Sequence, residues 1–379
     1  MLLVLSFVFF MLLGLPLFGV IGLASIISMI GMPFPMEFIP QNLYTGMDQF
    51  PLIATIGFVM AGFLMEPAGI TGEIIEVAKK AVGNIRGGLA MVTILACMIF
   101  AALSGSGPAT TAAIGSIMIP GMIAAGYRKD DAAAVSATGG TLGILIPPSN
   151  PMIIYGIIAN TSIAALFTAG FVPGFVLGLM MMLMAYFLAR RAGFTGTVDE
   201  DKGAHFWPMF RKNFFSLMAP VIILGSIYAG ICTPVEASVV AVFYALFVGT
   251  CITRELKIIQ LWDAIKLTNV SAGSIIIVLG VSTLFGRILT MQRIPHQLAN
   301  AMITLTDNPY VILVLIGLLL LFLGMFMETL ATIVILAPIF LPLITKVGID
   351  PCCQAVGKNI CNPIMQAKLL NEKKTDLNI

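Results

Sequence analysis

Long apolar runs without any charged residue divide this chain into segments. Met1–Met36, Gly88–Tyr127 and Ala132–Ala189 contain no Asp, Glu, Lys, Arg or His, and shorter charge-free runs follow after Asn213. A bilayer core is crossed by a helix of about 20 apolar residues, so the pattern predicts roughly nine to eleven helical segments. A membrane barrel would instead alternate apolar and polar residues over strands of about ten residues. We therefore expect an all-α integral membrane protein.

Composition and charge agree with lipid as the solvent. Of 379 residues, 59% are hydrophobic and 10% charged, whereas an ordinary soluble domain carries about a quarter charged residues. Basic residues gather in two loops, Arg190–Lys212 and Arg254–Lys266, which we expect to face the cytoplasm because cytoplasmic loops are enriched in Lys and Arg. We expect the lipid bilayer as a partner, and no nucleic acid.

A weak internal repeat divides the chain into two halves. Residues recur at an offset of 222: Ala109, Thr110, Ile117, Pro120 and Gly126 as Ala331, Thr332, Ile339, Pro342 and Gly348. Many secondary transporters are built from such repeats. Lys79 and Lys80 close a segment of the first half whose counterpart in the second lacks them, which favours two inverted repeats with opposite faces toward the cytoplasm. We predict a first membrane repeat at 1–190, a cytoplasmic linker at 191–213 and a second repeat at 214–350.

The final residues depart from the repeat. The first half continues to the paired prolines Pro147 and Pro148, but the second half has no matching break near Leu369. Residues 351–379 are polar and contain no apolar run of spanning length. We therefore expect an incomplete second repeat followed by an aberrant polar tail.

Two breaks in the first half are candidates for a polar site. Ser104–Pro108 and Ile146–Pro151 interrupt charge-free runs with Gly and Pro, which cannot continue a helix. Unpaired backbone groups are costly in hydrocarbon, so broken helices at membrane depth line a cavity or lie within protein. Their carbonyls and hydroxyls suit a hard cation such as Na⁺, and the following helix N-termini suit a carboxylate. The alternative is that both breaks are simple turns at the membrane surface.

Few ionisable residues lie near the apolar runs. Glu66, Glu236, Arg287 and Glu328 are candidates by default. We expect Glu66 and Glu236 to lie at span ends and cap or pair locally, Arg287 to lie at the site or extend to the interface, and Glu328 to align with Ser106 and help hold a cation. The six cysteines lack zinc-ligand spacing and are interpreted as buried packing residues and free thiols.

Enzyme classes find little support. The chain has no G-x-x-x-x-G-K-[ST] phosphate loop. A serine nucleophile at Ser104 or Ser106 would need a nearby base, and the two histidines, His205 and His296, lie outside the apolar runs. An intramembrane serine hydrolase is therefore kept only as an alternative, and we expect a protein that is not an enzyme.

Four stretches of sequence resemble one known family. They are "LSGSGPATTAAIGSIMIPGM" from Leu103, "SATGGTLGILIPPSNPMIIYG" from Ser136, "GSIYAGICTPVEASVVAVFYAL" from Gly225 and "LGMFMETLATIVILAPIFLP" from Leu323. In this order they resemble the large membrane subunit of tripartite ATP-independent periplasmic (TRAP) transporters. The resemblance covers roughly Met1–Pro351.

The resemblance implies an elevator-type carrier with re-entrant hairpins, multi-pass in a bacterial inner membrane. It implies import of organic acids, such as C4-dicarboxylates or sialic acid, driven by Na⁺ as coupling ion and with no other cofactor. The implied partners are a small four-helix membrane subunit and a periplasmic substrate-binding protein. The family usually continues after Asp350 with a further proline-rich break and a final helix, so the alternative here is a non-functional remnant of such a permease.

The resemblance also implies which residues bind substrate and ion. They lie in the first hairpin, the following break and the second hairpin: Ser104, Gly105, Ser106, Gly107, Thr138, Gly139, Gly140, Thr141, Pro147, Pro148, Ser149, Asn150, Glu328, Thr329 and Thr332. Five of these are expected near Na⁺: Ser104, Ser106, Gly139, Thr141 and Pro147.

Overall fold

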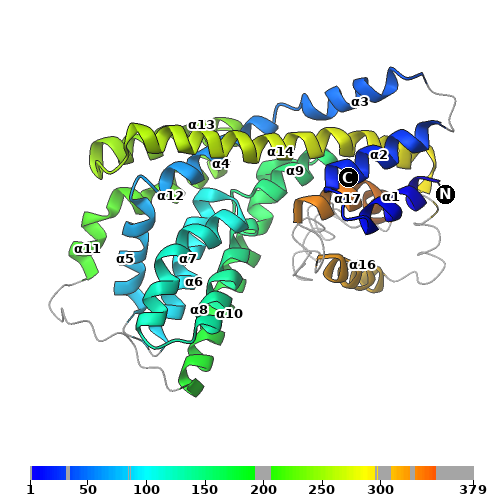
Figure 1. The fold of residues 1–379 in the computed structure, drawn as a ribbon. Coiled ribbons are helices and arrows are strands. Elements are labelled where there is room, and N and C mark those ends of the chain that lie inside the picture. Colours follow the sequence, from blue (N-terminus) through cyan, green and yellow to red (C-terminus); the bar gives the residue numbers. More distant parts are fainter. Residues whose placement is uncertain are drawn as a thin grey trace, which may run out of the picture. The chain divides into compact units, whose positions relative to one another are not determined.

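The computed structural model describes most of the chain. It covers residues 2–30, 35–83, 85, 87–192, 206–294, 297, 309–324 and 329–346. Every regular element among these residues is a helix (Figure 1). This confirms the all-α prediction for the described part. Glu328, both histidines and the tail at 351–379 lie outside the described residues, so the expectations for them stay predictions.

The helices form two compact units that we describe separately. Unit 1 comprises residues 1–48, 154–169 and 277–379, and unit 2 comprises residues 49–153 and 170–276. Each unit takes segments from both predicted sequence halves. The packing units and the predicted division at 1–190, 191–213, 214–350 and 351–379 are therefore different partitions of the chain.

Unit 2 contains the predicted breaks. Its elements are α4 (Leu52–Met65), α5 (Ile70–Val82), α6 (Gly88–Ser104), α7 (Gly107–Ala124), α8 (Lys129–Gly140), the 3-10 turn η1 (Thr141–Ile144), the start of α9 (Asn150–Ala159), most of α10 (Ile163–Ala192), α11 (Phe206–Lys212), α12 (Phe214–Tyr228), α13 (Pro234–Phe247), the π-helical turn η2 (Val248–Ile252) and the start of α14 (Ile258–Met291). Helices α6, α7 and α8 lie side by side (Figure 1). Helix α13 packs along α4, where Gly57 makes room for the buried side chain of Ser238.

Unit 1 has a core of its own. It contains α1 (Leu2–Leu12), α2 (Leu17–Ile30), α3 (Phe38–Met47), the end of α9, the start of α10, the end of α14, α16 (Pro309–Gly324) and α17 (Thr329–Lys346). Buried side chains from α1, α2, α14 and α17 form one apolar cluster that includes Leu3, Ile21, Phe285 and Ile335. The Gln292 amide donates to the Ser28 hydroxyl over 3.0 Å and ties the end of α14 to α2.

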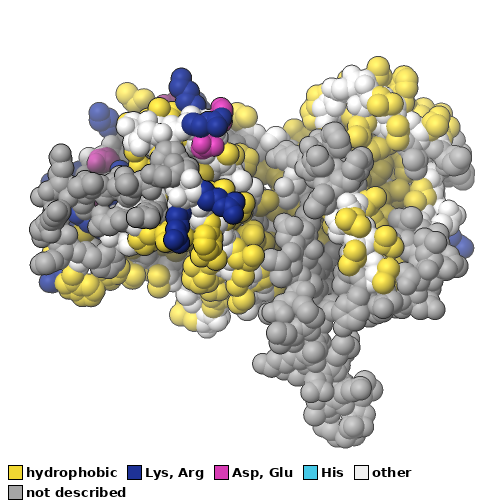
Figure 2. Space-filling model, turned by 90° about the horizontal axis from the view of Figure 1, so that it is seen from below, with side chains coloured by type: hydrophobic (Ala, Val, Ile, Leu, Met, Phe, Trp, Pro, Cys, Tyr) yellow, Lys and Arg dark blue, Asp and Glu magenta, His cyan; other side chains and the backbone are white. Residues whose placement is uncertain are grey.

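The described helices fit a membrane protein. Four of them are long and apolar enough to cross a bilayer, or five if the neighbouring helices α3 and α4 count together as one broken span. Others, such as α6 and α12, are apolar but shorter. Hydrophobic side chains occupy broad areas of the described surface in Figure 2, while Lys and Arg gather in few places. Such a surface needs lipid or a protein partner around it.

Helix bounds agree with the internal repeat. Helix α7 spans Gly107–Ala124 and α17 spans Thr329–Lys346, each of 18 residues. Their first residues differ by 222 (329 − 107), and so do their last residues (346 − 124). Both helices also contain a proline at the matching position, Pro120 and Pro342. The structure therefore supports a repeated helix at the offset read from the sequence.

Several other residues that the sequence singled out lie among the described residues. Glu66 is the C-cap residue that follows α4. Glu236 forms a capping box with Thr233 at the start of α13, in which each side chain accepts a hydrogen bond from the backbone N–H of the other residue. Arg287 is exposed near the end of α14. Cys97, Cys232 and Cys251 are free thiols, but only Cys97 is buried, so the interpretation as buried packing residues is wrong for the exposed Cys251.

Candidate functional site at the junction of two helix breaks

The first break is the tip of a helical hairpin. Helix α6 ends at Ser104, Gly105 adopts a left-handed conformation with φ of 60°, and Ser106 is the extended N-cap of α7. A left-handed residue here favours glycine, which has no Cβ to clash. At the other end of the hairpin, the Thr93 hydroxyl lies 3.8 Å from the Met122 sulfur. The chain therefore turns back on itself at Gly105 and Ser106.

Three hydroxyl-bearing residues form a network inside this tip. Thr110 Oγ1 donates to the Ser106 carbonyl over 2.8 Å, and Ser104 Oγ lies 2.9 Å from Thr110 Oγ1. Because Thr110 uses its one proton on Ser106, the Ser104 hydroxyl is the donor to Thr110. The Ser104 oxygen accepts from the Ser106 N–H over 3.5 Å and keeps a second lone pair. Ser106 Oγ accepts from the Ala109 N–H at the start of α7. The serine oxygens thus remain able to accept from, or coordinate, a further group.

The second break follows α8. The chain passes through η1, the irregular stretch Leu145–Ser149 and then α9, because Pro147 and Pro148 offer no N–H to a helix. Thr141 Oγ1 donates to the Thr138 carbonyl over 2.7 Å, and Ser149 Oγ donates to the Ile144 carbonyl over 2.6 Å. These side chains hold the irregular backbone in a defined path.

The two breaks meet. The Asn150 N–H donates to the Gly105 carbonyl over 3.1 Å, which joins the first residue of α9 to the hairpin tip. A Cβ added at Gly105 would lie 2.5 Å from the Pro148 carbonyl oxygen, and one at Gly143 would lie 2.6 Å from the Ser106 carbonyl oxygen. Glycine is therefore required on both sides of the contact. We call this contact between residues 104–107 and residues 140–150 the junction.

One polar group at the junction lacks a partner. The Asn150 side chain is 3% exposed, and its Oδ1 accepts no hydrogen bond from any described residue. A buried carbonyl oxygen without a partner costs about 1–3 kcal/mol, and such groups in native proteins call for an explanation such as an ion or water. The N-termini of α7 and α9 both lie at the junction, so the partial positive charge of two helix ends is directed there.

Packing from neighbouring helices holds the junction in place. Gly62 of α4 faces the tip, where an added Cβ would lie 3.2 Å from the Cα and Cβ of Ser104. On the other side, Gly170 and Gly174 of α10 let Met152 and Ile146 approach closely. Ser104, Ser149 and Asn150 are consequently buried. This burial argues against the alternative that the breaks are open turns at the membrane surface.

The structure brings together most of the predicted site residues of the first half. Ser104, Gly105, Ser106, Gly107, Gly140, Pro148, Ser149 and Asn150 lie at the junction. Gly139 faces Cys97, and Thr138 and Thr141 are exposed, with hydroxyls donating to backbone carbonyls within their own segment. Thr329 begins α17 and Thr332 is buried, and both belong to unit 1.

Three residues at or beside the junction were not predicted from the sequence. Thr110 completes the hydroxyl network, Gly62 backs the tip and Gly143 admits the Ser106 carbonyl. The repeat contained a signal for Thr110, since it aligns with Thr332, which the sequence did indicate, and both side chains are fully buried. Nothing in the sequence marks Gly62 or Gly143 among the 37 glycines.

The junction also bears on the alternative of a serine hydrolase. The Ser104 hydroxyl contacts the Thr110 hydroxyl and the Ser106 backbone, and the Ser106 hydroxyl contacts the Ala109 N–H. None of these groups is a base that could activate a nucleophile.

Comparisons with known proteins agree with this architecture. The family model described as "Tripartite ATP-independent periplasmic transporter, DctM component" matches residues 4–361. A second model, "Protein of unknown function (DUF1847)", matches residues 345–379, so the last residues also resemble a different family. The solved structure of the Alcanivorax borkumensis YdaH transporter superposes with a TM-score of 0.59 at 16% identity, covering 93% of this chain and 86% of that one; this likeness concerns the fold alone.

Relatives with curated descriptions point the same way. The chain is 40% identical over 346 residues to the isethionate TRAP transporter permease protein DctMQ of Oleidesulfovibrio alaskensis, covering 91% of this chain and 54% of that protein. It is 40% identical to the sialic acid large permease protein SiaM of Vibrio cholerae (83% and 74% covered) and 37% identical to the C4-dicarboxylate large permease protein DctM of Pseudomonas aeruginosa (82% and 72% covered). The chain thus spans about half of the first relative and about three quarters of the other two. It belongs to the DctM family of TRAP transporter large permeases, which are multi-pass inner-membrane transport proteins and not enzymes.

Proposed function

We propose that this permease carries an organic-acid anion across the membrane together with Na⁺, and that the junction binds both. The observation that carries the proposal is the contact between the two breaks, where Asn150 N–H joins Gly105 O and the buried Asn150 Oδ1 has no partner among the described residues. Broken helices that meet inside a transporter fold are the usual way in which such proteins solvate a substrate and its coupling ion.

Oxygen ligands at the junction support Na⁺. Hard cations bind carbonyl, hydroxyl and carboxylate oxygens, and the junction offers the Ser104 and Asn150 side-chain oxygens beside backbone carbonyls of the irregular stretch. Ser106, Gly139, Thr141 and Pro147 stay proposed contributors, through carbonyl or hydroxyl oxygens. The Glu328 carboxylate of the second half, with Thr329 and Thr332, is proposed for the equivalent role at the second hairpin.

Helix N-termini at the junction support an anionic substrate. Helices α7 and α9 begin at Gly107 and Asn150, and the first N–H groups of a helix carry partial positive charge that favours a carboxylate or a related anion. The relatives are described as permeases for isethionate, sialic acid and C4-dicarboxylates, and all three names denote organic anions. We propose the same chemical class here, of C4-dicarboxylate or sialic-acid type.

The family name supports the proposed partners. A tripartite system requires two components besides the large permease. We propose a small four-helix membrane subunit and a periplasmic binding protein that delivers the anion.

Uptake by proteoliposomes tests the proposal. The purified chain is reconstituted with the proposed small subunit and binding protein, and uptake of radiolabelled succinate, sialic acid and isethionate is measured with an inward gradient of NaCl or of KCl. We expect uptake of one of these anions with NaCl and loss of uptake with KCl. Asn150→Ala should reduce Na⁺-driven uptake at least tenfold.

A matched control separates transport from folding. Asn213→Ala makes the same change at another buried asparagine of unit 2. Asn213 lies just before α12, and its side-chain amide donates to the Glu76 carboxylate of α5. It should leave the Na⁺ dependence intact. Uptake that is indifferent to Na⁺ would contradict the coupling, and no uptake of any anion by a well-folded preparation would favour the non-functional alternative.

A further inference from the structure

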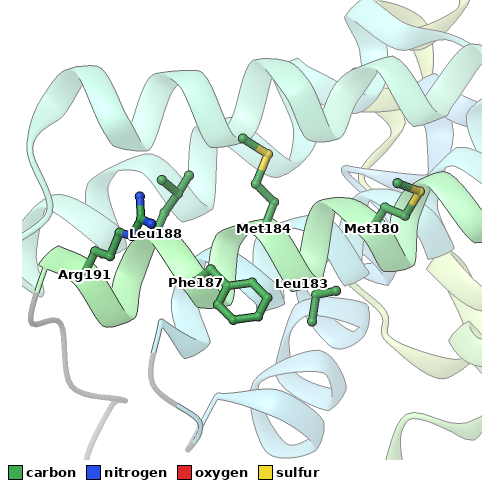
Figure 3. A pocket seen from close by; sticks show the side chains of 6 residues that line it. All are labelled: Met180, Leu183, Met184, Phe187, Leu188 and Arg191. Atoms are coloured by element: carbon green, nitrogen blue, oxygen red, sulfur yellow. The ribbon is translucent and has the colours of Figure 1, made fainter.

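The outer face of α10 carries a groove that the transport site does not use. It has a volume of about 380 Å³ and is lined by Met180, Leu183, Met184, Phe187, Leu188 and Arg191. Figure 3 shows all six side chains projecting from this one helix. The five apolar side chains are each more than half exposed. We call this surface the α10 groove.

The opposite face of α10 is packed, so the groove is a fixed surface. Gly170, Gly174 and Gly178 let the side chains of Met152, Ile146 and Met98 approach closely. Further along the same face, Ala185 and Ala189 are buried, and an added Cβ at Gly87 would lie 2.3 Å from the Ala189 Cβ. Small residues at this spacing allow close helix packing in membranes. The exposed face therefore cannot turn inward without breaking these contacts.

Charge is placed at one end of the α10 groove only. Arg191 lines it, Arg190 is exposed beside it, and α10 itself has no acidic residue. Both arginines begin the basic loop that we assign to the cytoplasmic side. An apolar groove that ends in exposed guanidinium groups matches a molecule with an apolar chain and an anionic head.

The length of the groove fits one leaflet of a bilayer. From Met180 to Arg191 the helix advances about 16 Å at 1.5 Å per residue, and half of a hydrocarbon core of roughly 30 Å is about 15 Å. An acyl chain beside Met180–Leu188 would thus place its phosphate at the level of Arg191. The anionic lipids of the cytoplasmic leaflet attract basic residues at this depth.

We propose that the α10 groove is a binding site for an anionic phospholipid of the cytoplasmic leaflet, with an acyl chain along Met180–Leu188 and the phosphate at Arg191. Helix α10 also packs, through Gly174, on Ile146 of the second break. A lipid bound outside α10 therefore lies on the helix that supports the junction.

Fluorescence quenching by brominated lipids tests the site. The two native tryptophans, Trp207 and Trp262, are replaced by Phe, and Leu183→Trp places a single reporter in the groove. The full chain is reconstituted in phosphatidylcholine containing brominated phosphatidylglycerol or, separately, brominated phosphatidylcholine. We expect phosphatidylglycerol to associate about fivefold more strongly, the factor that one arginine near an anionic surface provides, and this preference should weaken in 0.5 M KCl.

Variants and a control position decide the outcome. Arg191→Gln should abolish most of the preference, Arg191→Lys should keep it, and a reporter at the exposed apolar Phe243 of α13 (Phe243→Trp) should show none. Equal quenching of the Leu183→Trp reporter by both lipids, or a preference unchanged by Arg191→Gln, would overturn the proposal. Absence of quenching by either lipid would also overturn it, because a protein segment would then cover the groove.

Discussion

Gly105 is the residue at which the junction is easiest to break. Its φ is 60°, and an added Cβ would lie 2.5 Å from the Pro148 carbonyl oxygen. Two other glycines allow the backbone strain and the clash of the added Cβ to be measured separately. Gly126 has φ of 92° with nothing within 4 Å of an added Cβ, and Gly121 in α7 has open space at ordinary helical geometry. The substitution Gly105→Ala therefore adds strain and a clash, Gly126→Ala adds strain alone, and Gly121→Ala adds neither.

The magnitudes follow from these contacts. A non-glycine residue in the left-handed region costs about 1–2 kcal/mol, which is the whole effect expected for Gly126→Ala. Gly105→Ala must in addition move Pro148 away and lose the hydrogen bond from Asn150 N–H, worth about 1 kcal/mol. We expect a loss of about 2–3 kcal/mol in the free energy of unfolding for Gly105→Ala. Gly121→Ala should be neutral or stabilise by about 0.5–1 kcal/mol.

Denaturation by SDS in mixed micelles, with NaCl or KCl at equal ionic strength, measures both stability and ion binding. The wild-type chain should be more stable in NaCl than in KCl, because a Na⁺ ion bound only by the folded state adds stability. Gly105→Ala should lose this difference, whereas Gly126→Ala should keep it. If Gly105→Ala is no more damaging than Gly126→Ala and keeps the NaCl effect, the junction does not hold the ion.

Two further substitutions probe the junction, and a third probes a remote helix cap. Thr110→Val removes the hydroxyl between Ser104 and the Ser106 carbonyl. It should lower the free energy of unfolding by about 1–3 kcal/mol and weaken the NaCl effect. An unchanged NaCl effect would show that the network only supports folding. Gly143→Ala places a Cβ 2.6 Å from the Ser106 carbonyl oxygen and should reduce Na⁺-driven uptake, which normal uptake would contradict. Thr233→Ala removes the N-cap of α13 and should cost about 1 kcal/mol in the same SDS titration without altering the NaCl effect.

The local breaks could be predicted from the sequence because each rests on a short-range rule. Gly105 and Pro108 disfavour one continuous helix through this stretch, and in the structure α6 ends at Ser104 and α7 begins at Gly107. The offset of 222 read from the sequence likewise holds for both ends of α7 and α17. Rules of this kind need only neighbouring residues or a comparison of the chain with itself.

The contacts between distant segments could not be predicted in this way. The sequence marked both breaks as candidates for a polar site, but it could not show that Gly105 contacts Asn150, because non-local backbone contacts leave no periodic signal. The apolar runs also overstate the regularity of the helices, since α9 has only 10 residues and α6 has 17, fewer than an ordinary span. The two compact units interleave the sequence halves, which composition and charge gave no reason to expect.

Direct binding of ²²Na⁺ to the purified chain tests the central claim, that the junction of the two breaks holds the coupling ion. We predict saturable binding that Asn150→Ala weakens at least tenfold and that the matched change Asn213→Ala leaves unaltered. Saturable binding that survives Asn150→Ala at full affinity would place the ion elsewhere and contradict the account.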